Sequence, residues 1–452
     1  MHDTDLSYID IRGIISRFDE VLSDFRGSSR GRGRPAGVSL GTLLFSTIRQ
    51  KIFNRGGMTE HVEKTCSKNL EGSTISRRLA KIPKNQLEAV SESLLGPIGE
   101  RSTNPQGYYH DYRMVGIDGT CFTLINTDAI LEKVPKSKSR NRMGEEPGEV
   151  AFPQIYASSL VELGPHNPVA LSVGVEGESE MELSMGLISK LTGSDMLFAD
   201  RRYGVAWFLH QLLEQSFCRA FLLKLSAVQT SREIEQLEDG SWIVEVDVRS
   251  RRRPGDIIAT HRVREIRFEV TSIDGQGQPR TDPYRLWTNF MDCRRDPALQ
   301  LVELYRERWE HEAYYRELKL ELKKQKYLKA QLIETAHIEI LSMVWASSLI
   351  ARERLRLSTM NQPQEKSRRI RFDVVAEQMR VIWPLQTQVG KHLSHDQFKA
   401  IVQSLSEDSS LYYTPKRRTR SCPRKVRKTQ THWPKLRQRT ESKQPPNITI
   451  TQ

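Results

Sequence analysis

The chain has 452 residues, 37% of them hydrophobic, and a formal net charge of +13 at pH 7. This length suits about two to four domains with apolar cores of their own, so we expect a globular protein. The five cysteines are widely separated, with no CxxC pair and no histidine spacing typical of a zinc site, which suits a reducing compartment.

Neither a signal peptide nor a membrane span is predicted. The amino terminus, MHDTDLSYIDI, is acidic where a signal peptide is basic. The longest nearly uncharged apolar run, 340–351, is too short to cross a bilayer. We therefore expect a soluble, cytoplasmic protein. Its positive charge implies either a polyanionic partner or a strongly solvated surface.

The amino-terminal segment 1–37 is predicted to be an amphipathic helix followed by a basic linker. The linker contains Arg32-Gly33-Arg34-Pro35, which resembles the core of an AT-hook. In such a hook, Arg32 and Arg34 would lie in a narrow minor groove of DNA. A plain flexible linker is the alternative interpretation.

Residues 38–107 show helical periodicity in several pieces, which predicts a helical domain. Ser73 is a candidate N-cap for a helix over 73–82 that carries Arg77, Arg78 and Lys81. One interpretation is a DNA-binding domain in which this helix reads a groove. The other is a helical bundle whose basic residues are only solvated.

Residues 108–226 alternate between strand and helix patterns, which indicates an α/β domain with a mixed sheet. The predicted strands are 113–118, 121–126, 154–163, 169–175, 196–199 and 219–225, and the predicted helices are 179–191 and 205–215. Asp118-Gly119 is expected at the turn between the first two strands, and Asp200 directly follows the buried run 196–199. Taken singly, a hairpin turn and a helix N-cap would explain these two aspartates. A basic loop over 133–142 supplies three candidate DNA contacts: Lys136, Lys138 and Arg140.

The rest of the chain divides into further regions. Residues 227–290 alternate at period two, with turns at Pro254-Gly255 and Asp274-Gly275, which predicts an all-β insertion. Residues 291–355 and 356–413 return to helical periodicity. The tail 414–452 is expected to be disordered when alone, because 415–443 holds twelve basic residues against Glu441 alone. It would add sequence-independent affinity for DNA that falls with salt.

The stretch LYRERWEHEAYYRELK, 304–319, is dense in charges and aromatic rings. In a regular α-helix at roughly 100° per residue, four of its side chains share a stripe about 60° wide. They are Tyr305, Arg308, Glu312 and Lys319. Glu310 and Glu317 project to the opposite side, where we expect solvent. An ordinary salt-bridged, solvated helix is the alternative, but a phosphate backbone beside a carboxylate would suit this stripe.

The same four residues match Y-x(2)-R-x(3)-E-x(6)-K, which resembles the signature of the insertion-sequence-four family of transposases, relatives of the transposon-five and transposon-ten enzymes. Two further segments, IDGT with Asp118 and ADRRYG with Asp200, look like the segments that hold the family's first and second catalytic aspartates. The resemblance covers about 108–355. It implies an α/β fold with a ribonuclease-H-like catalytic core, an inserted all-β subdomain, and helical regions on either side.

The resemblance makes Asp118, Asp200 and Glu312 the expected catalytic residues and metal ligands. In-line cleavage of a phosphodiester is served by two divalent cations about 4 Å apart, one at the attacking oxygen and one at the leaving oxygen. Carboxylates with waters and phosphate oxygens suit Mg²⁺, so two Mg²⁺ ions are expected, with Mn²⁺ as a substitute.

The resemblance also implies DNA contacts. Tyr305, Arg308 and Lys319 would hold phosphates, with Arg201 beside them. An aromatic ring of the insertion would stack on a flipped base. Tyr284 lies where the family's stacking tryptophan falls, while Trp287 lies three residues later, on the opposite strand face. A role of Tyr284 in the core is the alternative interpretation, so both rings are candidates for the stacking residue.

The expected activity is therefore that of a DDE transposase. It would cleave the ends of its own insertion sequence and join their 3′-hydroxyls to target DNA by direct transesterification. Its partners would be double-stranded DNA, namely inverted-repeat ends and target, and a second copy in a synaptic homodimer associated with the nucleoid. The alternatives are a domesticated, inactive DNA-binding protein and a nuclease without strand transfer.

Overall fold

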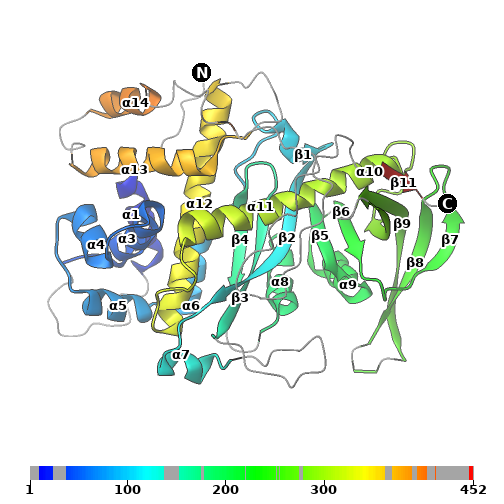
Figure 1. The fold of residues 1–452 in the computed structure, drawn as a ribbon, viewed down its shortest axis with the longest axis horizontal. Helices are drawn as coiled ribbons and strands as arrows, with labels where there is room; N and C mark the ends of the chain where they lie inside the picture. The colour runs from blue at the N-terminus through cyan, green and yellow to red at the C-terminus, as the bar shows by residue number, and fades with distance from the viewer. Residues whose placement is uncertain are drawn as a thin grey trace. The chain divides into compact units, whose positions relative to one another are not determined.

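The computed structural model describes most of the chain and divides it into two compact units. The described residues are 10–23, 37–136, 152–174, 178–218, 220–250, 252–253, 255–273, 278–361, 369–388, 394–404, 413 and 447–450. The first unit comprises Met1–Lys190 and Trp309–Thr414, and the second comprises Leu191–Arg308 and Pro415–Gln452. Each unit is thus assembled from two distant segments of the chain (Figure 1).

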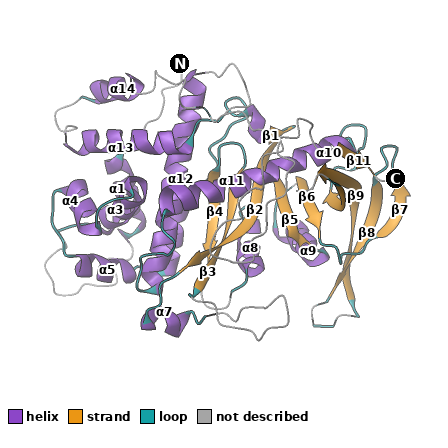
Figure 2. Ribbon diagram, in the orientation of Figure 1, coloured by secondary structure: helices purple, strands orange, loops and turns teal. Residues whose placement is uncertain are grey.

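Helices make up most of the first unit (Figure 2). They are α1 Ile11–Val21, α3 Leu40–Phe53, α4 Met58–Cys66, α5 Gly72–Ala80, α6 Lys84–Leu94, η1 Pro105–Gly107, α7 Asp128–Lys133, α8 Glu180–Ile188, α11 Trp309–Glu317, η3 Leu318–Lys323, α12 Ile333–Asn361, α13 Phe372–Gln388 and α14 His395–Ser404. The long helix α12 packs against both α3 and α13. Pairs of aromatic rings fill this core. The ring centres of Phe18 and Trp345 are 5.7 Å apart, and those of Phe45 and Trp383 are 5.1 Å apart. The helical periodicity predicted for 38–107 is therefore present, with its apolar faces buried in a bundle.

Local sequence sets several of these helix boundaries. The Asp10 side chain accepts hydrogen bonds from the backbone N–H groups of Arg12 and Gly13, which starts α1. Ser179 forms a capping box at the start of α8 with Glu182. The helix expected over 73–82 begins earlier, at Gly72, so Ser73 lies inside α5 and is not its cap.

The first unit also holds an antiparallel sheet in the order β4-β3-β2, with β1 paired to β2. Its strands are β1 Tyr108–Tyr109, β2 Tyr112–Thr123, β3 Gln154–Glu162 and β4 Asn167–Val173. The turn predicted at Asp118-Gly119 is wrong, because β2 runs through both residues and pairs Asp118 with Ser159. Glycine at position 119 instead lets the side chain of Glu180 pack closely against the strand. A Cβ at Gly119 would lie 2.1 Å from Cγ of Glu180.

The second unit is built on a mixed sheet in the order β5-β6-β10-β9-β8-β7. Its elements are β5 Asp195–Gly204, α9 Ala206–Gln215, β6 Ala220–Leu225, β7 Arg232–Gln236, β8 Trp242–Arg249, β9 Ile257–Ile273, β10 Pro279–Thr288, α10 Ala298–Tyr305, η2 Arg306–Arg308 and β11 Asn447–Ile450. Strands β5 and β6 are parallel, and the other pairs are antiparallel. The strands β7 to β10 fall where period-two alternation predicted strands. With its helices, the protein has a mixed α/β fold.

The carboxy-terminal end differs from the expectation of disorder. Residues Asn447–Ile450 form β11, which pairs antiparallel with Thr271 to Phe268 of β9. The most basic part of the tail, 415–443, lies outside the described residues, as do Arg32, Arg34, Lys138 and Arg140. Within the part of the chain that the structure describes, no helix is both long and apolar enough to cross a lipid bilayer.

Candidate functional site

Asp118 lies in the middle of β2, in the first unit, with a partly exposed side chain. Its carboxylate accepts a hydrogen bond from the backbone N–H of Gly119 at 2.8 Å. Its backbone carbonyl accepts from the hydroxyls of Tyr315 at 2.7 Å and Ser158 at 3.2 Å. The backbone at Asp118 is thus held by two neighbouring elements, the sheet through Ser158 and helix α11 through Tyr315.

Helix α11 lies directly on β2 because Gly116 has no side chain. A Cβ at Gly116 would lie 2.7 Å from Nδ1 of His311, which is fully buried in α11. The ring of His311 contacts the Ser159 hydroxyl at 3.1 Å, and the Tyr315 hydroxyl contacts the same group at 2.9 Å. Glu312 lies one turn before Tyr315 and is partly exposed, so its carboxylate is carried on the helix that contacts the strand of Asp118.

Lys319 lies beside the same strand. Burial lowers the pKa of its ammonium, while the nearby Cys121 and Asp118 oppose that effect. Its Nζ is 5.6 Å from the centre of the Phe122 ring. The structure therefore brings together Asp118, the helix of Glu312, and Lys319.

The helix that carries these residues is not regular throughout. Residues Arg306–Arg308 form a 3-10 turn and Leu318–Lys323 form a π-helical segment, so a uniform 100° per residue does not describe the whole stripe. Glu312 and Lys319 belong to the first unit, whereas Tyr305 and Arg308 belong to the second.

The face opposite Glu312 is buried, so the expectation that Glu310 and Glu317 face solvent is wrong. Both carboxylates bind His166, at 2.8 Å from Nε2 and from Nδ1 respectively. Glu310 also pairs with Arg369, and Glu317 with Arg354 at 3.1 Å. Burial would raise the pKa of Glu310, but His166 and Arg369 outweigh it and lower that pKa far below its usual range. The charges of this face therefore anchor α11.

In the second unit, Asp200 lies where β5 loses its regular pairing. The parallel register with β6 is continuous up to Ala199 and resumes only at Gly204. The Asp200 carboxylate accepts from the backbone N–H of Arg202 at 2.8 Å. The Tyr305 hydroxyl donates to the carbonyl of Ala199 at 3.0 Å, so this tyrosine fixes the strand next to Asp200.

A group of cations surrounds Asp200 in the same unit. Burial lowers the pKa of Lys224, Arg308 and Arg201 lower it further, and Asp200 acts against them. The Lys224 ammonium lies 4.1 Å from the centre of the Tyr284 ring. Sequence reasoning missed Lys224, although a single lysine in the apolar strand AFLLKL was a usable signal.

The two candidate stacking rings have different environments. Trp287 is 0% exposed, and its indole N–H donates to Glu265 at 3.1 Å. A ring held in this way is part of the core and cannot meet a base. Tyr284 is partly exposed and stacks on Phe268 at 5.5 Å between ring centres. Tyr284 is thus the ring that a nucleic acid can reach.

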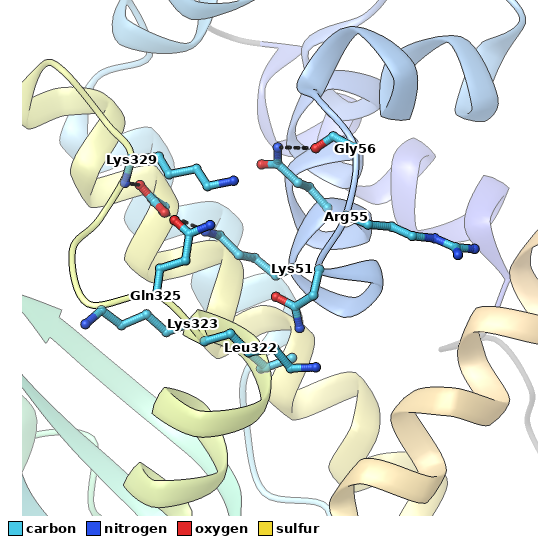
Figure 3. A pocket seen from close by; sticks show the side chains of 11 residues that line it. Lys51, Arg55, Gly56, Leu322, Lys323, Gln325 and Lys329 are labelled. Atoms are coloured by element: carbon cyan, nitrogen blue, oxygen red, sulfur yellow. Dashed lines mark hydrogen bonds and ion pairs between the residues drawn. The ribbon is translucent and has the colours of Figure 1, made fainter. Parts of the chain in front are cut away.

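A cationic pocket of the first unit adds a feature that sequence reasoning did not predict (Figure 3). It is open to solvent and is lined by four lysines and an arginine against one glutamate, Glu339. The cations are Lys51, Arg55, Lys323, Lys324 and Lys329. Glu339 binds the Lys51 ammonium at 2.6 Å and the backbone N–H of Lys329 at 2.9 Å, so most of the positive charge is left for an anion. Lys136, expected as a DNA contact, lies elsewhere, after α7, and is partly exposed.

The three candidate acidic residues carry donors of the kind that a hard divalent cation prefers. Asp118, Asp200 and Glu312 are carboxylates with partly exposed side chains, and oxygen donors with room for water are what Mg²⁺ prefers. The first unit supplies Asp118 and Glu312, and the second supplies Asp200. Each unit thus contributes acidic groups with basic side chains next to them.

Comparison with known proteins finds similarity to transposases in both sequence and structure. No protein-family profile matches the chain. The chain is 21% identical over 328 residues to the transposase InsG of insertion sequence element IS4 from Escherichia coli, which covers 71% of this chain and 71% of that protein. A solved piggyBac transposase synaptic complex with hairpin DNA matches 90% of this chain and 85% of its own, with a TM-score of 0.44 and 7% identity. By sequence, the chain is therefore similar to a transposase over 71% of its length.

Proposed function

We propose that the protein is a DDE transposase that cuts the ends of an insertion sequence and joins them to target DNA. The observation that carries the proposal is the hydrogen bond from Tyr315 to the carbonyl of Asp118, between residues 197 positions apart. It sets the helix of Glu312 against the strand of Asp118, as the expected acidic site requires. The sequence similarity to InsG supports the same class of protein.

In this proposal Asp118, Asp200 and Glu312 hold two Mg²⁺ ions, or Mn²⁺ in their place. When bound, the ions activate the attacking oxygen and stabilise the leaving one. The protein holds the scissile phosphate in line: Lys319 supplies positive charge from the first unit, and Arg201, Lys224 and Arg308 supply it from the second. Tyr305 positions β5, and Tyr284 would stack on an unstacked base once Lys224 moves off its ring.

The reaction would proceed in two displacements at phosphorus. First, water attacks the phosphodiester at the element's end. The bond between phosphorus and the 3′-oxygen of the element breaks, which leaves a free 3′-hydroxyl on the element. That hydroxyl then attacks a phosphodiester of the target, forming a new P–O bond as the target's own 3′-oxygen leaves. The first step consumes one water and converts a phosphodiester into a 5′-phosphate and a 3′-hydroxyl, and the second exchanges one phosphodiester for another. Neither step needs an oxidant, a reductant or a covalent enzyme intermediate. A homodimer would bring the two element ends together.

The test uses purified protein, labelled element ends, a target plasmid and Mg²⁺. We expect cleaved ends and joined products from the unmodified protein. Glu312→Gln should abolish both products while DNA binding, measured by gel shift, is retained. Glu303→Gln is the matched control. It makes the same change in charge, but at an exposed residue of helix α10.

The outcomes separate the alternatives. Cutting without joining would identify a nuclease, and binding without cutting would identify a DNA-binding relic of a transposase. Unchanged cutting by Glu312→Gln would reject the assignment of this glutamate. The cationic pocket favours a DNA partner in all three cases, because a cluster of lysines and an arginine attracts phosphates.

A further inference from the structure

A second group of possible metal ligands lies away from Asp200 in the second unit, on α9 and β9. His210 and Glu214 are one helical turn apart on α9, so their side chains share a face. His261 projects from β9, where its strand partner on β8 is Val246. One ligand atom from each of the three side chains can be chosen so that all lie within 4.8 Å of one another.

The two imidazoles already have the spacing of neighbouring ligands. Nδ1 of His210 lies 3.0 Å from Nε2 of His261, and the ring centres are 5.2 Å apart. In a tetrahedral zinc site with Zn–N bonds of about 2.0–2.1 Å, two nitrogen ligands are roughly 3.3 Å apart. A shift of a few tenths of an ångström would therefore open the pair to a metal ion.

The three side chains differ in their exposure to solvent. Both histidines are partly buried, and Glu214 is exposed. An ion here would thus have two ligands held by the fold, one adjustable carboxylate, and a side open to water.

We propose that His210, Glu214 and His261 bind one transition-metal ion of the Zn²⁺ class, with water in the fourth position. Two imidazoles and a carboxylate suit zinc, whereas Mg²⁺ selects oxygen donors, so this site is chemically distinct from the acidic one. The ion joins α9 to β9. Because α9 starts at Ala206, just after β5 ends at Gly204, the ion also steadies the helix that follows the strand of Asp200.

Metal content of the full-length protein tests the proposal. Protein stripped with a chelator is loaded with Zn²⁺, dialysed, and weighed by native mass spectrometry, and the affinity is measured by calorimetry. We expect one Zn²⁺ per chain, loss of that ion in both His210→Ala and His261→Ala, and at least tenfold weaker binding in Glu214→Gln. Zn²⁺ should raise the melting temperature of the unmodified protein and not that of the histidine variants.

Two controls keep the test decisive. Asp200→Asn removes a proposed Mg²⁺ ligand and should keep its Zn²⁺, so failure of the transposase proposal would not affect this result. His210→Gln, which retains polarity and size, guards against misfolding of the alanine variant and should also lose the ion. Retention of Zn²⁺ by the histidine variants, or no Zn²⁺ in the unmodified protein, would show that the two rings are only hydrogen-bonded to each other.

Discussion

Replacing Glu310 with glutamine tests whether the buried face of α11 holds Glu312 in place. The Glu310 side chain is only 6% exposed, lies 2.8 Å from the His166 ring, and pairs with Arg369. Glutamine keeps the shape and one acceptor oxygen but removes the charge, which leaves the Arg369 guanidinium without its ionic partner there. Arg369 still donates to the carbonyls of Gly164 and Leu163.

The magnitude follows from the burial of the pair. Removing one partner of a buried ion pair costs about 3–5 kcal/mol, because the other charge stays buried. The Arg369 side chain is 24% exposed, so water offsets part of that loss, and we expect Glu310→Gln to cost about 2–4 kcal/mol. If the proposed function is right, cleavage should also fall, since moving a catalytic group by about 1 Å costs roughly 100-fold in rate.

Urea and thermal unfolding, followed by circular dichroism, measure the effect. Glu303→Gln is the control, because this exposed residue should change the free energy of unfolding by less than about 0.5 kcal/mol. If Glu310→Gln unfolds at the same urea concentration and temperature as Glu303→Gln, the anchoring of α11 by this network is refuted.

Three further predictions follow from individual contacts. Burial would raise the pKa of Glu317, but Arg354 and His166 outweigh it and lower that pKa from 4.5 to about 2. The carboxylate therefore contributes about 3 kcal/mol above roughly pH 4.5 that is lost as the pH falls towards 2, which urea midpoints across this range will check. Gly116→Ala places a Cβ 2.7 Å from the His311 ring, and should cost about 1–3 kcal/mol in unfolding experiments. Lys329→Ala should weaken DNA binding equally for all sequences and reduce the slope of log affinity against log salt by about 1.

Local signals in the sequence predicted much of the secondary structure. The capping box of Ser179 marks the start of α8, because it depends on residues within one turn. Period-two alternation over 227–290 predicted the strands β7 to β10, because it depends only on which side chains face the same way. The candidate acidic residues were also chosen from sequence, through a motif and its spacing. Their shared role remains a proposal.

Contacts between distant segments decided the rest. Asp118-Gly119 looks like a turn in isolation, but Gly119 lies in a strand where Glu180 leaves no room for a side chain. Helical spacing could separate Glu310 from Glu312, yet it could not show which face meets His166 and Arg369 and which meets water.

The sequence by itself therefore determined most of the helices and strands, since their periodicity lies in neighbouring residues, and a resemblance carried by short motifs named the acidic candidates. Only the tertiary structure decided which charges are buried, that Lys224 lies over Tyr284, and that two histidines from α9 and β9 meet at 3.0 Å. The physical reason is that burial and electrostatic partners depend on residues far apart in the chain, which no periodicity encodes.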